Sequence, residues 1–475
     1  MNQDLPENQL TQKHLEKIKA FYGKNSLTTN SFGMGYRKLI ARSLGYIIPS
    51  NASVLEIGCG HGALLKLLKN KDVTGIDVAP EQVEAAKKNV AHGQFFCMSG
   101  ENISLDRKFD FIILSDTLNE AADVQALLEK IQGVATPSTR LVINFYNTLW
   151  RPALSLLTML GLKAKRPESS WLSCTDVRSL LGLANWDVIR EEPRILFPLQ
   201  VPVLQTFLNR YMAPFFSFCN LTCFTVARPM GVANEDQPSV TVVVPARNES
   251  GNIEDAVKRT PKMGKWTELL FIEGNSTDNT WEEIQRVKAA YPDHKITIMQ
   301  QSGKGKGNAV RDAFDAAQGD ILMILDADLT MPPEDLPKYY HAITSGKAEF
   351  VNGVRLVYPM EDKAMRFLNM CGNKFFSIVF SWLLSQPVKD TLCGTKVLYK
   401  TDYQKIAANR SYFGNFDPFG DFDLLFGASK LNLKIVDIPI RYRNRNYGDT
   451  NISRFRHGMI LLRMVAYASR KLKFI

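Results

Sequence analysis

The chain has 475 residues, of which 45% are hydrophobic and 22% are charged. This balance is typical of globular protein and excludes a fibrous or largely disordered chain, and the length predicts about three domains at ~150 residues each. The net charge of +10 favours anionic partners such as phosphates, nucleic acid or an acidic membrane face.

The N-terminal 150 residues predict a nucleotide-binding fold. Residues 14–22 and 37–46 have the apolar spacing of helices. At 54–65, VLEIGCGHGALL runs from an apolar strand through three glycines into a helix, and glycine lets a backbone approach a ligand closely. A second strand at 73–76 ends in Asp77, an acid that can accept hydrogen bonds from ribose hydroxyls. This order predicts an adenosine-containing ligand without separating a dinucleotide from other adenosine ligands.

The same stretch, with GIDVAPEQVEAAKKN at 75–89, resembles motifs I and II of class I S-adenosylmethionine-dependent methyltransferases. The resemblance implies a Rossmann-like fold with its fourth strand at 109–116 and its fifth at 141–145. The residues that it implies for S-adenosylmethionine are Glu56, Gly58, Gly60 and Gly62 at the methionine end, Asp77 at the ribose and Glu101 at the adenine.

The methyl acceptor is left open. His61 and Tyr146 are candidate bases, with loop packing as the alternative for each. A non-catalytic binding or scaffold module is the alternative for the whole domain.

Residues 148–228 are rich in Leu, Phe, Trp and Pro and are interpreted as a helical and aromatic insertion on a core of about 50–147. The polar, proline-flanked stretch at 229–238 is the best candidate linker. We therefore predict a first domain at 1–232, a linker at 233–238 and a second domain at 239–475.

The second domain begins with predicted strands at 240–244 and 269–272, each followed by acids. Acids at the tips of consecutive parallel strands can hold a nucleobase and a ribose, although Asp278 could equally cap the helix that follows. SGKGKGNAVRDAF at 302–314 combines glycines with Lys304, Lys306 and Arg311, which suit phosphate contact. A P-loop is excluded, because GxxxxGK[ST] is absent.

The stretch GDILMILDADLTMPP at 319–333 is the strongest candidate site. An apolar strand at 321–325 ends in Asp326 and Asp328, at the edge where open α/β sheets bind ligands. Two carboxylates this close repel each other unless a cation lies between them, and oxygen ligands suit Mg²⁺ or Mn²⁺. Capping of the next helix is the alternative role.

The ordered set VVVPARNE, EGNSTDNT, GKGKGNAVR, DADLTMPPEDL, NGVR and DTLCGTK resembles glycosyltransferase family 2, and within it the dolichol-phosphate mannose synthase-like branch. The resemblance covers 239–475. It implies a GT-A fold and metal-dependent, inverting transfer from a nucleotide sugar to a polyprenyl phosphate or a glycan. The residues that we assign to the nucleotide sugar are Pro245, Arg247, Glu249, Glu273, Asp278, Lys304 and Asp326, with Asp326 and Asp328 as metal ligands.

The acceptor decides which further residues matter. A hydroxyl acceptor, as in polysaccharide synthesis, needs a general base, and Asp421 is the first candidate and Asp423 the second. A phosphate monoester has a second pKa near ~6 and is already nucleophilic at neutral pH. The residues that would then clamp the acceptor phosphate are Lys396, Arg441, Arg443 and Arg445.

The tail at 452–475 has several Arg and Lys and no acid, which favours a basic amphipathic helix on an anionic membrane surface. A packing helix is the alternative, and a nucleic-acid arm lacks supporting motifs. Seven scattered Cys without a CxxC pair predict reduced thiols in the cytoplasm. No signal peptide and no apolar run of ~20 residues is visible. We therefore expect a cytoplasmic protein, peripheral at the inner face of a membrane, that does not bind nucleic acid.

Overall fold

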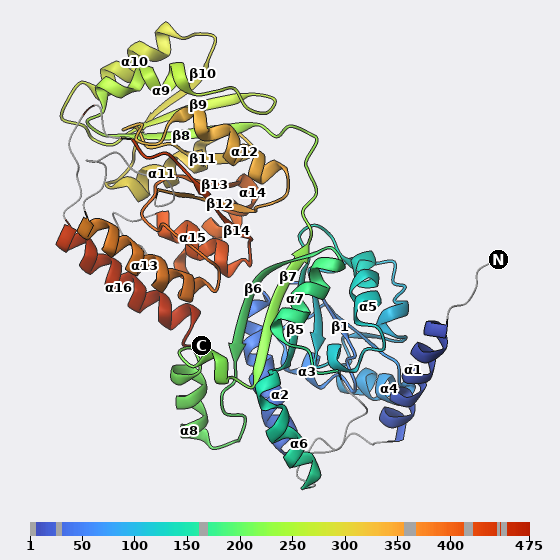
Figure 1. Cartoon of the computed structure of the whole chain (residues 1–475). Helices are drawn as coiled ribbons and strands as arrows, with labels where there is room; N and C mark the ends of the chain where they lie inside the picture. The colour runs from blue at the N-terminus through green and yellow to red at the C-terminus, as the bar shows by residue number, and fades with distance from the viewer. Residues whose placement is uncertain are drawn as a thin grey trace. The chain divides into compact units, whose positions relative to one another are not determined.

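The computed structural model describes residues 6–24, 31–160, 170–355, 367–412, 421–443, 447 and 454–475. The chain forms two compact units, Met1–Met230 with Phe474–Ile475, and Gly231–Lys473 (Figure 1). Each is built on a mixed seven-stranded sheet with crossovers between parallel strands, which confirms the predicted class of two Rossmann-like α/β domains. None of the described helices combines the length and the hydropathy that a bilayer crossing requires.

The first sheet has the strand order β3-β2-β1-β4-β5-β7-β6. Its first five strands are parallel, and β7 is antiparallel to both β5 and β6. The strands are β1 (Val54–Ile57), β2 (Val73–Asp77), β3 (Gln94–Cys97), β4 (Phe111–Ser115), β5 (Arg140–Tyr146), β6 (Trp186–Arg194) and β7 (Thr222–Pro229). The helices of this unit are α1 (Pro6–Lys24), α2 (Ser31–Ile47), α3 (Ala63–Leu67), α4 (Pro80–Asn89), α5 (Val124–Ile131), α6 (Arg151–Met159), α7 (Cys174–Leu183) and α8 (Pro202–Phe207).

The prediction for residues 148–228 needs correction, because this segment supplies β6 and β7 to the sheet and is not simply an insertion. β7 lies between β5 and β6 and is buried along almost its whole length. β6, WDVIREEPR, is an edge strand rich in charges, so it lacks the apolar run by which a buried strand is recognised. Arg190 and Glu192 are nevertheless buried there.

The second sheet has the order β10-β9-β8-β11-β13-β12-β14. β10, β9, β8 and β11 are parallel, β13 is antiparallel to β11 and β12, and β14 is parallel to β12. The strands are β8 (Val240–Ala246), β9 (Thr267–Glu273), β10 (Lys295–Gln300), β11 (Ile321–Ile324), β12 (Phe350–Val354), β13 (Lys396–Tyr399) and β14 (Ile435–Pro439). The helices are α9 (Ile253–Arg259), α10 (Thr280–Ala290), α11 (Lys306–Ala316), α12 (Leu336–Thr344), α13 (Phe367–Leu384), α14 (Lys400–Ala408), α15 (Asp421–Lys430) and α16 (Arg454–Leu472).

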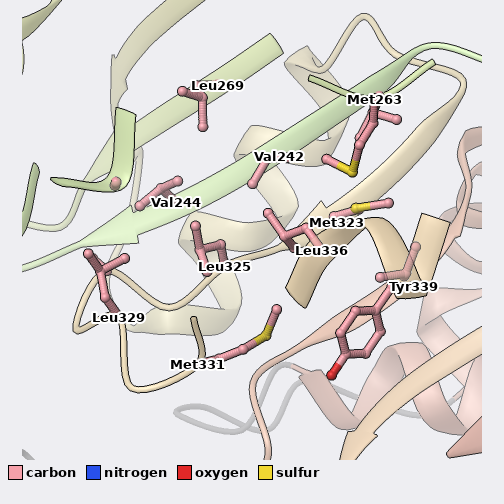
Figure 2. Close-up of a cluster of buried hydrophobic side chains, with 14 of the residues drawn as sticks. Val242, Val244, Met263, Leu269, Met323, Leu325, Leu329, Met331, Leu336 and Tyr339 are labelled. Atoms are coloured by element: carbon pink, nitrogen blue, oxygen red, sulfur yellow. The ribbon is translucent and has the colours of Figure 1, made fainter. Parts of the chain in front are cut away.

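The core of the second unit continues beyond the end of β11. Leu325, Ala327, Leu329 and Met331 all belong to the buried cluster that contains alternate residues of β8. Figure 2 shows Leu325, Leu329 and Met331 gathered with Val242 and Val244 of β8. Alternate residues of this stretch are therefore anchored in the core, and the acids lie between them.

The predicted amphipathic tail is α16, and it packs against α13. Leu461, Met464, Ala468 and Leu472 are buried at helical spacing, whereas Met459 and Leu462 are exposed. Part of its apolar surface thus serves packing, the alternative that the sequence left open.

Candidate active sites

The glycine turn after β1 lies at the carboxyl end of the parallel strands of the first sheet. Gly58, Gly60 and Gly62 all have positive φ, at 73°, 52° and 74°. A Cβ on Gly58 would lie only 2.6 Å from Thr117 Oγ1, so this position accepts no other residue without a shift. The turn brings backbone N–H groups to the edge where open α/β sheets bind ligands.

Asp77 is the last residue of β2 and holds the glycine turn in place. Its Oδ2 accepts the N–H of Gly60 at 2.8 Å, and its Oδ1 accepts the N–H of Ala79 at 3.0 Å. Burial outweighs these hydrogen bonds and raises the pKa of Asp77 above its ordinary value. A carboxylate offers about four lone-pair sites, so both oxygens can still accept ribose hydroxyls.

Glu56 of β1 is buried, with 3% of its surface exposed, and its Oε2 has no hydrogen-bond partner in the described part of the chain. Burial raises the pKa of Glu56 to about 8, with Arg37 acting against the shift and Asp77 adding to it. A buried carboxyl oxygen without a partner is costly, which points to a ligand that donates a hydrogen bond here. An acid beside the glycine turn fits the ammonium-bearing methionine end of S-adenosylmethionine.

The raised pKa of Glu56 predicts a pH dependence of folding. Between pH 4.5 and about 8 the folded domain holds a proton that the unfolded chain has lost, so the free energy of unfolding falls as pH rises through this window. Asp77 acts in the same direction. We expect Glu56→Gln to flatten this fall by an amount on the order of 1–3 kcal/mol. Thermal unfolding at pH 5.5 and 8.5 measures the effect, with the exposed Glu129→Gln as control, and equal slopes for all three proteins would contradict it.

The other candidates in this domain have partners of their own. Glu101 Oε1 accepts the N–H of Ala122 at 3.1 Å, which ties it to the loop after β4. His61 Nε2 lies 3.3 Å from Arg37 Nη1, and burial followed by the Arg37 charge lowers the pKa of His61. The ring of Tyr146 stacks on Tyr36 with centroids 5.7 Å apart. Arg37 of α2 was missed from the sequence because nothing local marks it.

In the second domain, the turns after three parallel strands share an unusual backbone feature. Asn248 follows β8, Asn275 follows β9 and Leu329 follows β11, with φ of 56°, 58° and 50°. Positive φ is common for Asn and rare for Leu, and such strain clusters at functional sites. The burial of Leu329 in the core holds it there. The carboxyl ends of these strands are thus the place to look for a ligand.

The acids predicted to bind the nucleoside mainly brace these turns. Glu273 Oε1 accepts the N–H of Ser276 at 2.5 Å, and Glu249 accepts Asn252 Nδ2 at 2.8 Å. Asp278 accepts the N–H of Thr280, the first residue of α10, at 3.0 Å, but the N-cap position of this helix belongs to Asn279 and not to Asp278. Burial opposes the charge on Asp278, but hydrogen bonds from Thr280 and Ser250 outweigh it and lower its pKa.

The remaining residues predicted for the nucleotide sugar differ in exposure. Arg247 and Lys304 are exposed and Pro245 is half-buried. Their contact with a nucleotide sugar stays a prediction.

Asp326 is paired with a lysine. Lys306 Nζ, at the start of α11, donates to Asp326 Oδ1 at 2.6 Å. Burial opposes the charge on Asp326, but Lys306, Lys396 and Arg355 outweigh it and lower its pKa. The backbone of Gly394 lies against this pair, since a Cβ there would be 2.3 Å from Asp326 Oδ2 and 2.4 Å from Lys306 Nζ. The sequence suggested Lys306 for phosphate contact without joining it to Asp326.

Asp328 is half-buried beside Asp326. Its Oδ1 accepts the N–H of Thr330 at 3.1 Å and the Thr330 hydroxyl at 2.9 Å. The carbonyl of Thr330 accepts the N–H of Arg443 at 2.9 Å, which brings one predicted phosphate ligand to the acid pair. Arg441 and Arg443 are exposed, and Arg445 lies outside the described residues.

The acid pair fits a divalent ion that is shared with a ligand. Among the described residues no three His, Cys, Asp or Glu gather into a complete metal site. Mg²⁺ is commonly held by one or two carboxylates together with substrate phosphates and water. Asp326 and Asp328 supply such a pair.

Lys396 is buried in the sheet, whereas a residue that binds the acceptor phosphate must be accessible from solvent. Lys396 begins β13 between β11 and β12, only 1% of its surface is exposed, and its Nζ donates to the Cys393 carbonyl. Its charge lowers the pKa of Asp326 from within the sheet. The prediction that Lys396 binds the acceptor phosphate is therefore corrected to an electrostatic role beneath the acids.

A buried ion pair that the sequence did not predict supports the same loop. Arg355 donates to both carboxylate oxygens of Asp390, at 2.7 and 2.9 Å, and Asn373 Nδ2 donates to Asp390 Oδ1 at 2.9 Å. Burial opposes the charge on Asp390, but Arg355 outweighs it and lowers its pKa to about 2. Asp390 also accepts the N–H of Leu392 at 3.0 Å, so the pair fixes the loop that leads to Gly394.

The two candidate bases lie on α15. Asp423 lies between two guanidinium groups, 3.8 Å from Arg311 Nη1 and 3.5 Å from Arg410 Nε. These two ion pairs within the domain engage the Asp423 carboxylate, and its role as general base stays a prediction. Asp421 begins α15, and its side chain lies outside the described part of the structure. Its role as general base stays a prediction.

Each of the two mixed α/β sheets carries acids and a glycine-containing turn at the edge where open α/β sheets bind ligands. Residues 34–191 match the family described as Methyltransferase domain, and residues 241–405 match Glycosyl transferase family 2. The chain therefore contains a methyltransferase domain followed by a family 2 glycosyltransferase domain.

Relatives of the second domain are transferases. The dolichol-phosphate mannosyltransferase of Pyrococcus furiosus is 36% identical over 220 residues, which are 45% of this chain and 59% of that protein. Glycosyltransferase AglJ of Haloferax volcanii is 29% identical over 225 residues, which are 47% of this chain and 69% of AglJ. Among solved structures, glucosyl-3-phosphoglycerate synthase of Mycobacterium tuberculosis, in complex with Mn²⁺ and UDP, is 18% identical and covers 50% of this chain and 80% of that chain, with a TM-score of 0.36.

Proposed function

We propose that the second domain transfers a sugar, with inversion, from a nucleotide sugar to a polyprenyl phosphate. The observation that carries the proposal is the acid pair at the end of β11, with Lys306 and Gly394 packed against it. The name of the Pyrococcus furiosus relative, dolichol-phosphate mannosyltransferase, supports this acceptor class.

The roles of the residues follow from the displacement. An acceptor oxygen forms a bond to the anomeric carbon while the bond from that carbon to the diphosphate oxygen breaks. Asp326 and Asp328 would hold a Mg²⁺ or Mn²⁺ ion that offsets the charge of the leaving diphosphate. Arg443 is exposed and donates its N–H to the Thr330 carbonyl beside the acid pair, and Arg441, two residues earlier, is also exposed. Both suit the acceptor phosphate. A phosphate acceptor is already ionised, so it needs no general base.

A screen of nucleotide sugars with a polyprenyl phosphate and Mg²⁺ or Mn²⁺ tests this function. We expect sugar transfer to the polyprenyl phosphate, lost on chelation of the metal. Glycans with free hydroxyl groups, tested in the same reactions, are the comparison. Transfer to the glycans alone would instead support polysaccharide synthesis.

We infer that the first domain binds S-adenosylmethionine and transfers its methyl group to an acceptor not yet identified. Bound there, S-adenosylmethionine would supply an activated methyl group, and alignment with a nucleophile supplies most of the rate. The buried Glu56 oxygen without a partner and the hydrogen bond from Gly60 of the glycine turn to Asp77 support the site.

Asp77→Ala should weaken S-adenosylmethionine binding by roughly 10- to 100-fold, because it removes the carboxylate that accepts hydrogen bonds from the ribose hydroxyls. Isothermal calorimetry on the full chain measures this. Asp123→Ala, which removes only the cap of α5, is the control and should bind like the wild type. Absence of binding by the wild type would leave the domain a scaffold.

We also propose that the protein works at the cytoplasmic face of a membrane, since a polyprenyl phosphate acceptor is held there by its hydrocarbon chain.

A further inference from the structure

The first domain exposes several large apolar side chains at its ligand edge. In α6 only Leu154 is buried, and Met159 is 78% exposed. Val203 of α8 is 84% exposed, and Phe218 is 69% exposed. We call this surface the apolar rim, and its members are Leu156, Met159, Leu160, Val203, Phe207 and Phe218.

Hydrogen bonds join the segment that leads into α6 to the segment around Phe218 that leads into β7. Asn147 Nδ2 donates to the Phe218 carbonyl at 3.1 Å, and Trp150 Nε1 donates to the Cys219 carbonyl at 2.8 Å. Asn147 and Trp150 precede α6, and Phe218 and Cys219 precede β7. Both segments therefore lie at the edge of the sheet where Tyr146, the last residue of β5, pairs with Thr222 of β7. Figure 1 draws α6 and α8 at the same end of this domain. The rim therefore adjoins the edge of the sheet that carries the glycine turn.

The shape of α6 distinguishes lipid from a protein partner. At 3.6 residues per turn, its exposed apolar side chains from Leu156 to Leu160 spread over roughly 160° of the helix surface, wider than the stripe of about 100° on a helix that faces one core. A flat protein partner would cover only one side of such a helix and leave some of these side chains in water. Acyl chains can surround the helix and cover all of them.

The charges in the sequence around α6 and α8 favour an anionic lipid surface. No Asp or Glu occurs at 147–166 or at 194–234, whereas Arg151, Lys163, Lys165 and Arg166 lie within the first of these segments. Arg151, at the start of α6, is exposed. Apolar helices flanked by cations lie in the interface of membranes that contain anionic lipids.

We propose that the apolar rim inserts into the interface of an anionic bilayer and sets the ligand edge of the first sheet at head-group level. The methyl acceptor is then the head group of a membrane lipid, a consequence that rests on the proposed methyltransferase function. The docking itself does not rest on that function. It gives the first domain its own membrane contact, apart from the basic helix α16.

Vesicle flotation with the full-length chain tests the docking. Wild type should float with vesicles of phosphatidylglycerol and phosphatidylcholine and bind phosphatidylcholine alone more weakly. The triple variant Met159→Glu, Val203→Glu and Phe218→Glu should bind the vesicles at least roughly tenfold more weakly than the wild type, because each change places a charge among acyl chains. Val232→Glu is the matched control, since Val232 is 83% exposed and lies outside the rim, and it should bind like the wild type.

Calorimetry with S-adenosylmethionine separates docking from catalysis. Vesicle binding that depends on the rim supports the docking even if the wild type binds no S-adenosylmethionine, in which case only the proposed methyltransferase function fails. Undiminished flotation of the triple variant overturns the docking. So does flotation that falls with Arg470→Glu and Lys471→Glu in α16 but not with the rim changes. A wild type that ignores vesicles and forms dimers that the triple variant loses would overturn it in favour of a second copy.

Discussion

Asp328→Ala should lower sugar transfer by roughly 10³-fold, the scale of removing one preorganised charge-stabilising group from a transferase site. Asp328 lies beside Asp326, and these two carboxylates are the proposed protein ligands of the metal. Without it, the ion that offsets the leaving diphosphate loses one of two protein ligands. The change also removes two hydrogen bonds to Thr330, at a cost in folding stability of about 1 kcal/mol each.

Initial rates with a saturating nucleotide sugar and varied Mn²⁺ measure this effect, and thermal unfolding checks the fold. Asp335→Ala is the control, because Asp335 pairs with Lys338 at 2.9 Å on the surface of the same segment, and such pairs contribute little. It should keep its rate within about twofold. Full activity of Asp328→Ala with a normal Mn²⁺ requirement would remove Asp328 from the metal site.

The sequence predicts those parts of the two sites whose residues belong to one short motif or to neighbouring strands. An apolar run followed by DAD places two acids at the end of a buried strand, and the structure adds that Leu325, Ala327 and Leu329 anchor the stretch in the core. The glycine turn after β1 is equally local, since Asp77 closes it from the very next strand. In both cases the short-range pattern and the parallel sheet determine the geometry.

The parts that were missed depend on strand order. β13 enters the sheet between β11 and β12, so Lys396 is buried beneath acids that lie 70 residues earlier in the chain. Arg355 and Asp390 meet for the same reason, across 35 residues. In the first domain, the charged edge strand β6 shows no apolar run, so its place in the sheet emerges only from its pairing with β7. The spacing of residues in the sequence does not predict any of these contacts.

Gly394 offers a test of the site that leaves every charged group in place. Its backbone lies so close to the Asp326–Lys306 pair that a single methyl group would overlap both side chains. The overlapping atoms are the far ends of flexible side chains, which can move aside at little cost to the fold. We expect this movement to break the 2.6 Å contact between Lys306 Nζ and Asp326 Oδ1.

We therefore expect Gly394→Ala to lower sugar transfer by roughly 10²-fold while thermal stability changes little, because a misplacement of about 1 Å at a reacting centre has that effect. Gly372→Ala in α13 is the matched control, since a Cβ there meets nothing within 4 Å and alanine favours a helix. It should keep full activity and gain stability. An active Gly394→Ala would show that the Asp326–Lys306 pair is not needed in this arrangement. A Gly394→Ala that fails to fold would point instead to the loop fixed by Arg355 and Asp390, whose rigidity then limits how far the pair can yield.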